Sequence, residues 1–334
     1  MKFYKILFFN SMIFGSLLAI SSFSWFSMWM GLEINLLSII PLMNSNKNSF
    51  PAEASIKYFI TQTIASSLVL MSIMINLNLL EFIPKNFNLY LNLMMNSGFL
   101  MKMGAAPFHF WFPEVMEGLS WMMCLIMLSW QKIAPMILLM TNLKLNSFMF
   151  MIIIYSSFIS GIQGLNQISL RKIMAYSSIN HIGWMLASMM FSNSIWIIYF
   201  IIYSLISINL IMILYNLNIF YLKQLFNSMN HMKLLKILFS LNFLSLGGLP
   251  PFLGFLPKWL TIYFLIQNNL YIMPMILIVL TLMTLFFYLR ISSNSMVIYS
   301  TENLSKKFWI KNSVILFNSI VLMGLMMCTL ILNL

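Results

Sequence analysis

The stretch LGGLPPFLGFLPKW, residues 246–259, places three prolines, three glycines and a lysine inside a long apolar run. Pro250, Pro251 and Pro257 each lack the backbone N–H that a helix interior needs, so they interrupt any helix there. Open backbone in an apolar environment is tolerated only where protein or a water-filled cavity supplies hydrogen bonds. Lys258 follows the prolines directly. The stretch therefore predicts a broken helix whose lysine faces the interior of a helix bundle.

The composition around this stretch is that of a membrane protein. The chain has 334 residues, of which 61% are hydrophobic and 7% charged, and its mean hydropathy is +0.92. Charged residues make up about a quarter of a typical soluble protein, so a water-soluble globular fold is excluded. Lipid solvates apolar surface without such charges. The expected fold class is an all-α polytopic membrane protein.

Apolar runs long enough to span a bilayer follow one another along the chain. About 20 residues cross a hydrocarbon core of ~30 Å. The linkers between the runs are short, so we expect one membrane domain over 1–334 and no nucleotide-, flavin- or nucleic-acid-binding domain. Eleven transmembrane helices are predicted, at 3–22, 24–43, 57–80, 87–112, 119–140, 147–166, 171–191, 194–217, 236–264, 270–290 and 311–332.

The basic residues indicate the orientation of these helices, because lysine and arginine collect on the side where the protein is made. If the N-terminus and the loops after even-numbered helices share one face, the opposite face holds only Lys85 and Lys144. This asymmetry places the N-terminus on the positive side. The positive face then holds 13 basic residues: Lys2, Lys5, Lys47, Lys57, Arg171, Lys172, Lys223, Lys233, Lys236, Arg290, Lys306, Lys307 and Lys311.

Several kinds of site are absent from the sequence. Cys124 and Cys328 both lie in apolar runs and are too few for a disulfide framework or a four-ligand metal site. The chain contains no aspartate, so it has no Ser–His–Asp triad, and it has no glycine-rich nucleotide loop. We expect the chain to bind no metal and no cofactor of its own.

Four ionisable residues fall inside the predicted spans: Glu33, Lys102, Lys132 and Lys258. A charge at the bilayer centre costs at least ~2.5–3.5 kcal/mol, so such residues face a bundle interior and mark ion or proton pathways. A buried lysine beside a carboxylate can load or release a proton near neutral pH. The four residues are therefore predicted to form a proton relay.

A second break accompanies Lys102 in SGFLMKMGAAPFHFWFPEV, residues 97–115. Pro107 removes a donor and is expected to free the Met103 carbonyl. The broken spans are the fourth and the ninth, so repeats over 1–145 and 146–292 each have a break in their fourth helix. Five helices per repeat invert the second repeat, which is the pattern of transporters. Residues 293–334 would form a C-terminal loop and a last helix.

Two histidines in the spans are further candidates. His181 lies mid-span in RKIMAYSSINHIGWM, residues 171–185, and is either a proton relay between the two repeats or an interhelical hydrogen-bonding residue. His109 directly follows the first break, and it either belongs to the relay or stabilises the break. The sequence leaves both pairs of alternatives open.

The motifs together resemble a known family. GAAPFHFWFPEV (104–115), SWQKIAP (129–135), LNQISLRKIMAYSSINHIGWM (165–185) and LGGLPPFLGFLPKW (246–259) are similar to subunit 2 of the mitochondrial NADH:ubiquinone oxidoreductases, respiratory complex I, with the insect proteins as the expected source. The resemblance runs from Glu33 to beyond Lys258. It implies an antiporter-like, proton-translocating membrane subunit with two broken helices.

This resemblance also implies roles, partners and a location. Glu33 and Lys102 would form a coupled pair, Lys132 would pass the proton onward, and Lys258 would lie near the exit. NADH, FMN, iron–sulfur clusters and ubiquinone would act in other subunits of the reductase. Partners would be neighbouring antiporter-like and accessory subunits and lipids such as cardiolipin, with no nucleic acid. The location would be the mitochondrial inner membrane, with the N-terminus in the matrix and the C-terminus in the intermembrane space.

Two alternative functions fit the same spans. A stand-alone cation/proton antiporter would work without NADH. A structural subunit that has lost conduction would only hold its neighbours together, but such a scaffold would gain nothing from four costly buried ionisable groups.

Overall fold

The computed structural model describes residues 3–44, 49–78, 85–143, 147–229 and 233–297, together with residues 318, 319 and 324. These ranges consist of helices joined by turns, with one isolated antiparallel bridge between Ser169 and Tyr221. The expected all-α class is confirmed. Several predictions lie outside the described residues. They are the predicted helix at 311–332, apart from residues 318, 319 and 324, as well as His231, Cys328 and the linker residues Lys2, Lys47, Lys144, Lys306, Lys307 and Lys311.

The chain divides into two compact units, with the boundary between Phe148 and Met149. Unit 1 contains α1 (Phe3–Ser21), α2 (Trp25–Met43), α3 (Phe50–Asn78), α4 (Lys85–Met103), α5 (Trp111–Gly118), α6 (Trp121–Leu128) and α7 (Trp130–Asn142). Unit 2 contains most of α8 (Ser147–Leu165), then α9 (Leu170–Met189), α10 (Asn193–Leu217), α11 (Leu222–Met229), α12 (Lys233–Gly247), α13 (Phe255–Gln267) and α14 (Ile272–Val297). The inversion of one repeat relative to the other stays a prediction.

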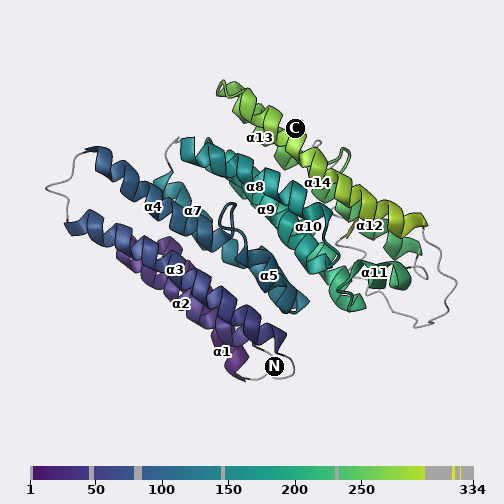
Figure 1. Cartoon of the computed structure of the whole chain (residues 1–334), viewed down its shortest axis with the longest axis horizontal. Coiled ribbons are helices and arrows are strands. Elements are labelled where there is room, and N and C mark those ends of the chain that lie inside the picture. The colour runs from purple at the N-terminus through teal and green to yellow at the C-terminus, as the bar shows by residue number, and fades with distance from the viewer. Residues whose placement is uncertain are drawn as a thin grey trace. The chain divides into compact units, whose positions relative to one another are not determined.

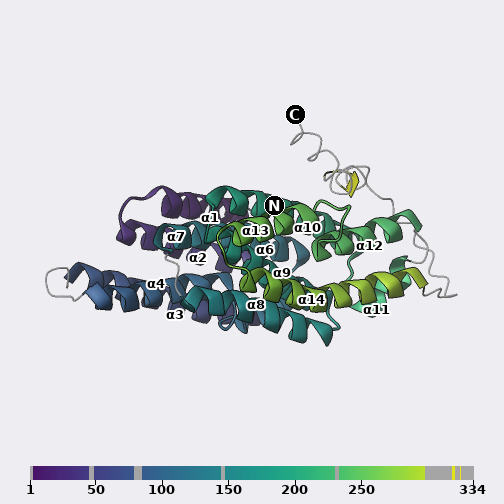
Figure 2. The same ribbon diagram turned by 90° about the horizontal axis from the view of Figure 1, so that it is seen from above.

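In unit 1, helices adjacent in the sequence pack against one another. α1 lies along α2, α2 along α3, and α3 along α4 and α5 (Figure 1). Seen from above, α1 and α2 lie in one layer of this unit and α3 and α4 in another (Figure 2). α1 and α2 approach so closely that a Cβ at Gly31 would stand only 2.5 Å from the backbone nitrogen of Ala19. Small residues permit such backbone approach in membrane helices.

In unit 2, α9 is the central helix. Apart from Arg171 and Lys172, its side chains are buried from Leu170 to Met189. α10, α13 and α14 pack against it, and α12 packs against α14 and α10. A polar residue on α9, such as His181, is therefore enclosed by other helices of its own unit.

Helix ends follow local sequence signals. The Ser24 hydroxyl caps α2 by accepting a hydrogen bond from the Ser27 N–H at 3.2 Å. α10 ends at Leu217 and is followed by Asn218, whose φ of 50° is the left-handed conformation common after a helix C-terminus.

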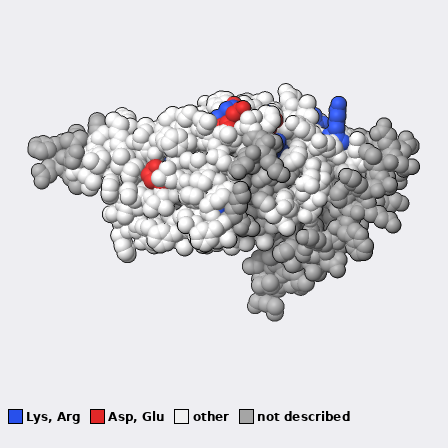
Figure 3. Space-filling view, turned by 90° about the horizontal axis from the view of Figure 1, so that it is seen from below, with Lys and Arg blue, Asp and Glu red and all other residues white. Residues whose placement is uncertain are grey.

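Among the described residues, seven helical segments are long and apolar enough to cross a membrane, and Leu235–Gly247 is a shorter apolar helix. Many of their large side chains, such as Phe14, Leu205 and Phe286, are exposed. Figure 3 shows a face on which charged side chains are sparse. This surface suits lipid as the solvent. The chain is a multi-pass membrane protein, whereas the count of eleven spans stays a prediction.

The helices differ from the predicted spans in three places. α3 begins at Phe50 rather than at 57, and the short α11, which the sequence did not predict, occupies 222–229. The span predicted at 119–140 is interrupted between α6 and α7 at Ser129, where φ is −110° and ψ is −76°. No proline or glycine marks this interruption. It places Lys132 in the first turn of α7.

Candidate functional site

The first helix break begins at the C-terminus of α4. Gly104 has a φ of +75°, a left-handed conformation that glycine adopts without steric cost. The Gly104 N–H donates to the Met101 carbonyl at 3.2 Å, and the Ala105 N–H donates to the Leu100 carbonyl at 3.0 Å. This is the Schellman arrangement, which uses two of the last helical carbonyls and leaves the next ones for other donors.

The second break, at the C-terminus of α12, has the same construction. Gly248 has a φ of +78°, its N–H donates to the Ser245 carbonyl at 3.0 Å, and the Leu249 N–H donates to the Leu244 carbonyl at 3.3 Å. Each break also contains a cis peptide bond before proline, at Pro107 and at Pro251. The two breaks predicted from the sequence are therefore built alike.

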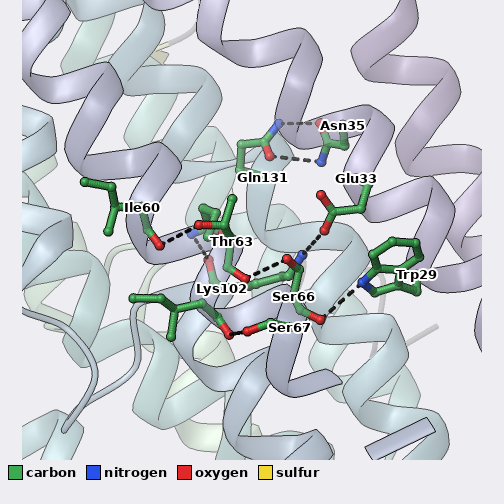
Figure 4. A network of polar contacts seen from close by, with 11 residues as sticks. Trp29, Glu33, Asn35, Ile60, Thr63, Ser66, Ser67, Lys102 and Gln131 are labelled. Atoms are coloured by element: carbon green, nitrogen blue, oxygen red, sulfur yellow. Dashed lines mark hydrogen bonds and ion pairs between the residues drawn. The ribbon is translucent and has the colours of Figure 1, made fainter. Parts of the chain in front are cut away.

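At the first break, the predicted Glu33–Lys102 pair is brought together inside unit 1. Lys102 lies in the last turn of α4, and its Nζ stands 3.9 Å from Oε1 of Glu33 on α2. Figure 4 shows the carboxylate and the ammonium pointing toward one another. The Lys102 side chain is 4% exposed and that of Glu33 is 21% exposed. A cation near a helix C-terminus is also favoured by the helix dipole.

Neutral polar side chains bind the backbone at the end of α4. The Gln62 amide donates to the Lys102 carbonyl at 3.4 Å, and the Trp111 indole donates to the Met101 carbonyl at 3.1 Å. The carbonyls at the end of α4 are thus satisfied by neutral side chains. Asn35 and Gln131 exchange two hydrogen bonds, of 3.0 and 3.1 Å, between α2 and α7 (Figure 4).

Lys132 is buried in the same unit, with only 1% of its surface exposed. Its Nζ stands 5.4 Å from the centre of the Phe112 ring, a cation–π distance. Because α7 begins at Trp130, Lys132 lies near the positive end of a helix, which does not favour an ammonium. Lys132 therefore lies deep in unit 1, over an aromatic ring and near the start of a helix.

Lys258 fills the second break in unit 2. Its Nζ donates to the Gly247 carbonyl at 2.8 Å and to the Leu246 carbonyl at 3.3 Å, the two carbonyls that the Schellman arrangement leaves over. Nζ also stands 5.9 Å from the centre of the Trp184 ring on α9. The side chain is buried. A helix C-terminus thus supplies the negative partial charge beside this lysine.

The prolines and His109 have different places in the two breaks. His109 is fully buried, and its Nδ1 stands 3.3 Å from the Pro107 carbonyl, so it packs within the break itself. Pro250 and Pro251 lie between α12 and α13. Pro257 instead lies in the first turn of α13, where proline fits because that turn needs no N–H donor. It begins a helix rather than interrupting one.

His181 lies in a buried cluster of tyrosines that the sequence analysis did not single out. Its Nδ1 stands 2.9 Å from the Tyr199 hydroxyl, and its ring centre lies 4.9 Å from that of Tyr203. One position earlier on α9, the Asn180 amide donates to the Thr284 hydroxyl at 3.2 Å. Trp184, which faces Lys258, lies one helical turn after His181. His181 and Lys258 are thus associated with the same stretch of α9.

The described residues were also compared for groups that could hold a metal ion. In the part of the chain that the structure describes, no three His, Cys or Glu side chains converge in a way that could hold a metal ion. What the site can do chemically is bind and release protons, since its ionisable groups are buried amines, a carboxylate and an imidazole.

A family model covers most of the chain. The model described as "NADH:quinone oxidoreductase/Mrp antiporter, TM" matches residues 22–284. The chain belongs to this family. Members of the NADH:quinone oxidoreductase/Mrp antiporter family named NADH-ubiquinone oxidoreductase chain 2 are similar over nearly the full length. The protein of Anopheles gambiae is 48% identical over 96% of this chain and 95% of its own length, and that of Aedes aegypti is 47% identical over 97% of each.

Solved structures share the family fold at lower identity. The chain matches a subunit of respiratory complex I from Thermus thermophilus with a TM-score of 0.86, at 22% identity, over 97% of this chain and 78% of that one. It also matches a subunit of the Mrp complex from a Dietzia species with a TM-score of 0.77, at 15% identity, over 89% of this chain and 61% of that one. The antiporter-like architecture expected from the sequence is therefore confirmed.

Proposed function

We propose that this chain is the chain 2 membrane subunit of a respiratory complex I and translocates protons across the mitochondrial inner membrane. Glu33, Lys102, Lys132, His181 and Lys258 are the residues of the path. The observation that carries this proposal is the Glu33–Lys102 pair, because a buried amine 3.9 Å from a carboxylate can exchange its proton as the pair is disturbed. The names of the relatives support the choice of complex.

The roles follow from the local surroundings. Lys102 holds a proton while Glu33 balances its charge. Lys132 lies buried in the first turn of α7 and is suited to accept a proton and pass it on. Lys258 holds its proton against the backbone carbonyls at the end of α12, from which a change at the break could release it. His109 packs in the first break and acts there as a stabiliser.

Electron transfer belongs to other subunits in this proposal. NADH, FMN, the iron–sulfur clusters and ubiquinone act elsewhere in the complex, and this chain converts the energy of that reaction into proton movement. The exposed apolar side chains of its helices suit neighbouring membrane subunits and lipids such as cardiolipin. The asymmetry of the basic residues supports a matrix N-terminus and an intermembrane-space C-terminus.

A stand-alone cation/proton antiporter is the second candidate, because the family and its solved members include Mrp antiporter complexes. Reconstitution of this chain alone in liposomes separates the two functions. The complex I function predicts no cation-driven proton flux under these conditions, whereas steady flux without NADH would establish the antiporter.

The proposal is tested with Lys132→Ala in the assembled complex. We expect fewer protons translocated per NADH oxidised, while NADH oxidation by artificial acceptors stays near the wild-type rate, because the redox centres lie elsewhere. The ratio is measured in sealed membrane vesicles from proton uptake and NADH absorbance. A wild-type ratio in this variant would remove Lys132 from the path.

A further inference from the structure

A groove lies between α12 and α14 of unit 2, two helices that pack against one another (Figure 1). Its volume is about 570 Å³, which lies in the usual range of sites for organic ligands. Its described wall combines one arginine, Arg290, with three serines and five apolar side chains. The groove therefore offers both a positive charge and an apolar surface.

The two helices of the groove run in opposite directions. The ring centre of Phe243 on α12 lies 5.8 Å from that of Tyr288 on α14. Further along α12, a Cβ at Gly247 would meet the side chain of Leu285, which precedes Tyr288. The beginning of α12 consequently lies beside the end of α14.

The polar part of the groove lies toward these two helix ends. On α12, Ser240 precedes Leu244, and on α14 the residues Arg290 and Ser293 follow Phe286. α14 has 26 residues and is ~39 Å long, whereas the hydrocarbon core of a bilayer is ~30 Å thick. Its last turns therefore reach the headgroup layer. The groove thus passes from a cation near the headgroups to apolar side chains in the hydrocarbon.

Arg290 carries its charge in a part of the chain that has no carboxylate side chain. Residues 149–297 contain seven basic residues and no aspartate or glutamate, and Glu302 lies outside the described residues. Arg290 is exposed, and its Nη2 donates to the Leu165 carbonyl at 2.6 Å. A guanidinium has several N–H donors, so it can bind a further acceptor beside this carbonyl. The ligand that complements the groove is therefore an anion with an apolar part.

The described part of the C-terminal segment contacts α12 on another side. The Asn242 amide donates to the side chain of Asn318. Asn242 lies about 200° around the helix from Ser240, because an α-helix has 3.6 residues per turn. In the groove, the side chains of Phe286 and Leu289 are exposed. The groove is thus directed away from the Asn318 contact and presents apolar surface of the kind that lipid solvates.

We propose that this groove binds one anionic phospholipid, with the phosphate on Arg290 and an acyl chain along Leu244, Phe286 and Leu289. Guanidinium groups bind phosphate oxygens through short, charge-assisted hydrogen bonds. Basic pockets between transmembrane helices recognise anionic headgroups in the same way. The inference goes beyond the proposed function and does not depend on whether the chain translocates protons.

Photoactivatable lipids test this site in the assembled complex. The complex is placed in phosphatidylcholine vesicles that contain a trace of photoactivatable phosphatidylglycerol or of photoactivatable phosphatidylcholine with the same reactive acyl chain. Labelled peptides are identified by mass spectrometry. The anionic probe is expected to label residues 240–244 and 286–293 about fivefold more than the zwitterionic probe, the factor that corresponds to ~1 kcal/mol for one basic residue at an anionic headgroup.

Arg290→Gln removes the positive charge, while its amide can still donate to the Leu165 carbonyl. Labelling by the anionic probe should fall about fivefold, to the level of the zwitterionic probe, and Arg290→Lys should keep most of it. The matched control is Lys223→Gln. Lys223 is an exposed cation on α11 of the same unit and is not among the described residues of the groove. Its loss should leave the labelling at the wild-type level.

Ser293→Glu decides the matter if Arg290→Gln fails to assemble. Ser293 is exposed in the groove, one helical turn after Arg290. A carboxylate at this position repels a phosphate but leaves the contact between Arg290 and the Leu165 carbonyl in place. Labelling by the anionic probe should fall as in Arg290→Gln, and wild-type labelling in this variant would contradict a phosphate on Arg290.

Three further results would overturn the inference. Equal labelling of the wild-type groove by both probes would show that it does not select an anion. An equal loss in Lys223→Gln and Arg290→Gln would show a general effect of surface charge. Protein density filling the groove in a high-resolution map would make a neighbouring subunit or residues 298–334 its occupant. The proton-to-NADH ratio of Lys132→Ala is independent of all these results, so the proposed function is tested separately.

Discussion

The two helix breaks share one backbone construction, but the positive charges of their lysines are stabilised by different groups. Both end a helix with a left-handed glycine, Gly104 or Gly248, and the same pair of backbone hydrogen bonds. At the first break, neutral side chains satisfy the helix carbonyls and Lys102 faces the Glu33 carboxylate. At the second, Lys258 itself donates to the carbonyls.

Lys102 and Lys258 therefore have different kinds of counter-charge. Glu33 is a carboxylate, so the charge of Lys102 is coupled to that of a second titratable group. The carbonyls at the end of α12 are fixed dipoles, so the charge of Lys258 depends on the geometry of the break. We infer that the first break responds to protons and the second to conformation.

The largest effect is expected from Glu33→Gln, which removes the carboxylate that distinguishes the first break from the second. The amide keeps the size of the side chain but removes the counter-charge of Lys102. Loss of one partner of a fully buried pair costs ~3–5 kcal/mol, and since Glu33 is 21% exposed we expect about half of that. Protons translocated per NADH should fall nearly as far as in Lys102→Ala.

Glu114→Gln is the control for that variant. It removes the ion pair between Lys57 and Glu114, whose atoms are closer, at 2.6 Å, but whose side chains are 51% and 54% exposed. Exposed pairs contribute little to stability. The ratio of protons to NADH should stay at the wild-type value in this control, and an equal loss in both variants would show that burial does not matter.

A smaller effect is expected from Gly104→Ala and Gly248→Ala, which change the corresponding glycine in each break. Both substitutions place a Cβ in a left-handed conformation at a backbone cost of roughly 1–2 kcal/mol. A Cβ at residue 248 would also lie 2.7 Å from Cδ of Lys258, whereas one at residue 104 would meet Phe112 at 3.1 Å and not Lys102. Gly248→Ala should therefore displace the lysine and lower pumping more than Gly104→Ala.

Gly104→Ala and Gly248→Ala are compared in assembled complex by thermal stability and by the ratio of protons translocated to NADH oxidised. Similar losses of stability with a larger loss of pumping in Gly248→Ala are expected. Equal pumping in the two variants would mean that the contact between Lys258 and the α12 carbonyls has no part in proton movement.

The positions of the breaks could be predicted from sequence because their causes are local. Pro107, Pro250 and Pro251 forbid a continuous helix wherever the chain is placed. The ends themselves are set a few residues earlier, at Gly104 and Gly248, because a left-handed glycine completes the last turn before the proline is reached. Side-chain donors bind the carbonyls of Met101 and Lys102, whereas the free carbonyl expected at Met103 stays a prediction.

Other features depend on tertiary packing and left no local signal. Ser129 interrupts a helix without proline or glycine, so nothing in its neighbours predicted that Lys132 lies in the first turn of a new helix. Tyr199 and Tyr203 read as packing residues in apolar spans, and only the arrangement of α9 and α10 brings them to His181. The pairing of Asn35 with Gln131 joins residues 96 positions apart.

The most direct test of the account compares Lys102→Ala, Lys258→Ala and the double variant in assembled complex, by protons translocated per NADH oxidised. Residues that act in one path are strongly non-additive. The account predicts that each single variant lowers the ratio and that the double variant lowers it no further than the more severe single variant. Wild-type ratios in the single variants, or losses that add in the double variant, would contradict a single path through both breaks.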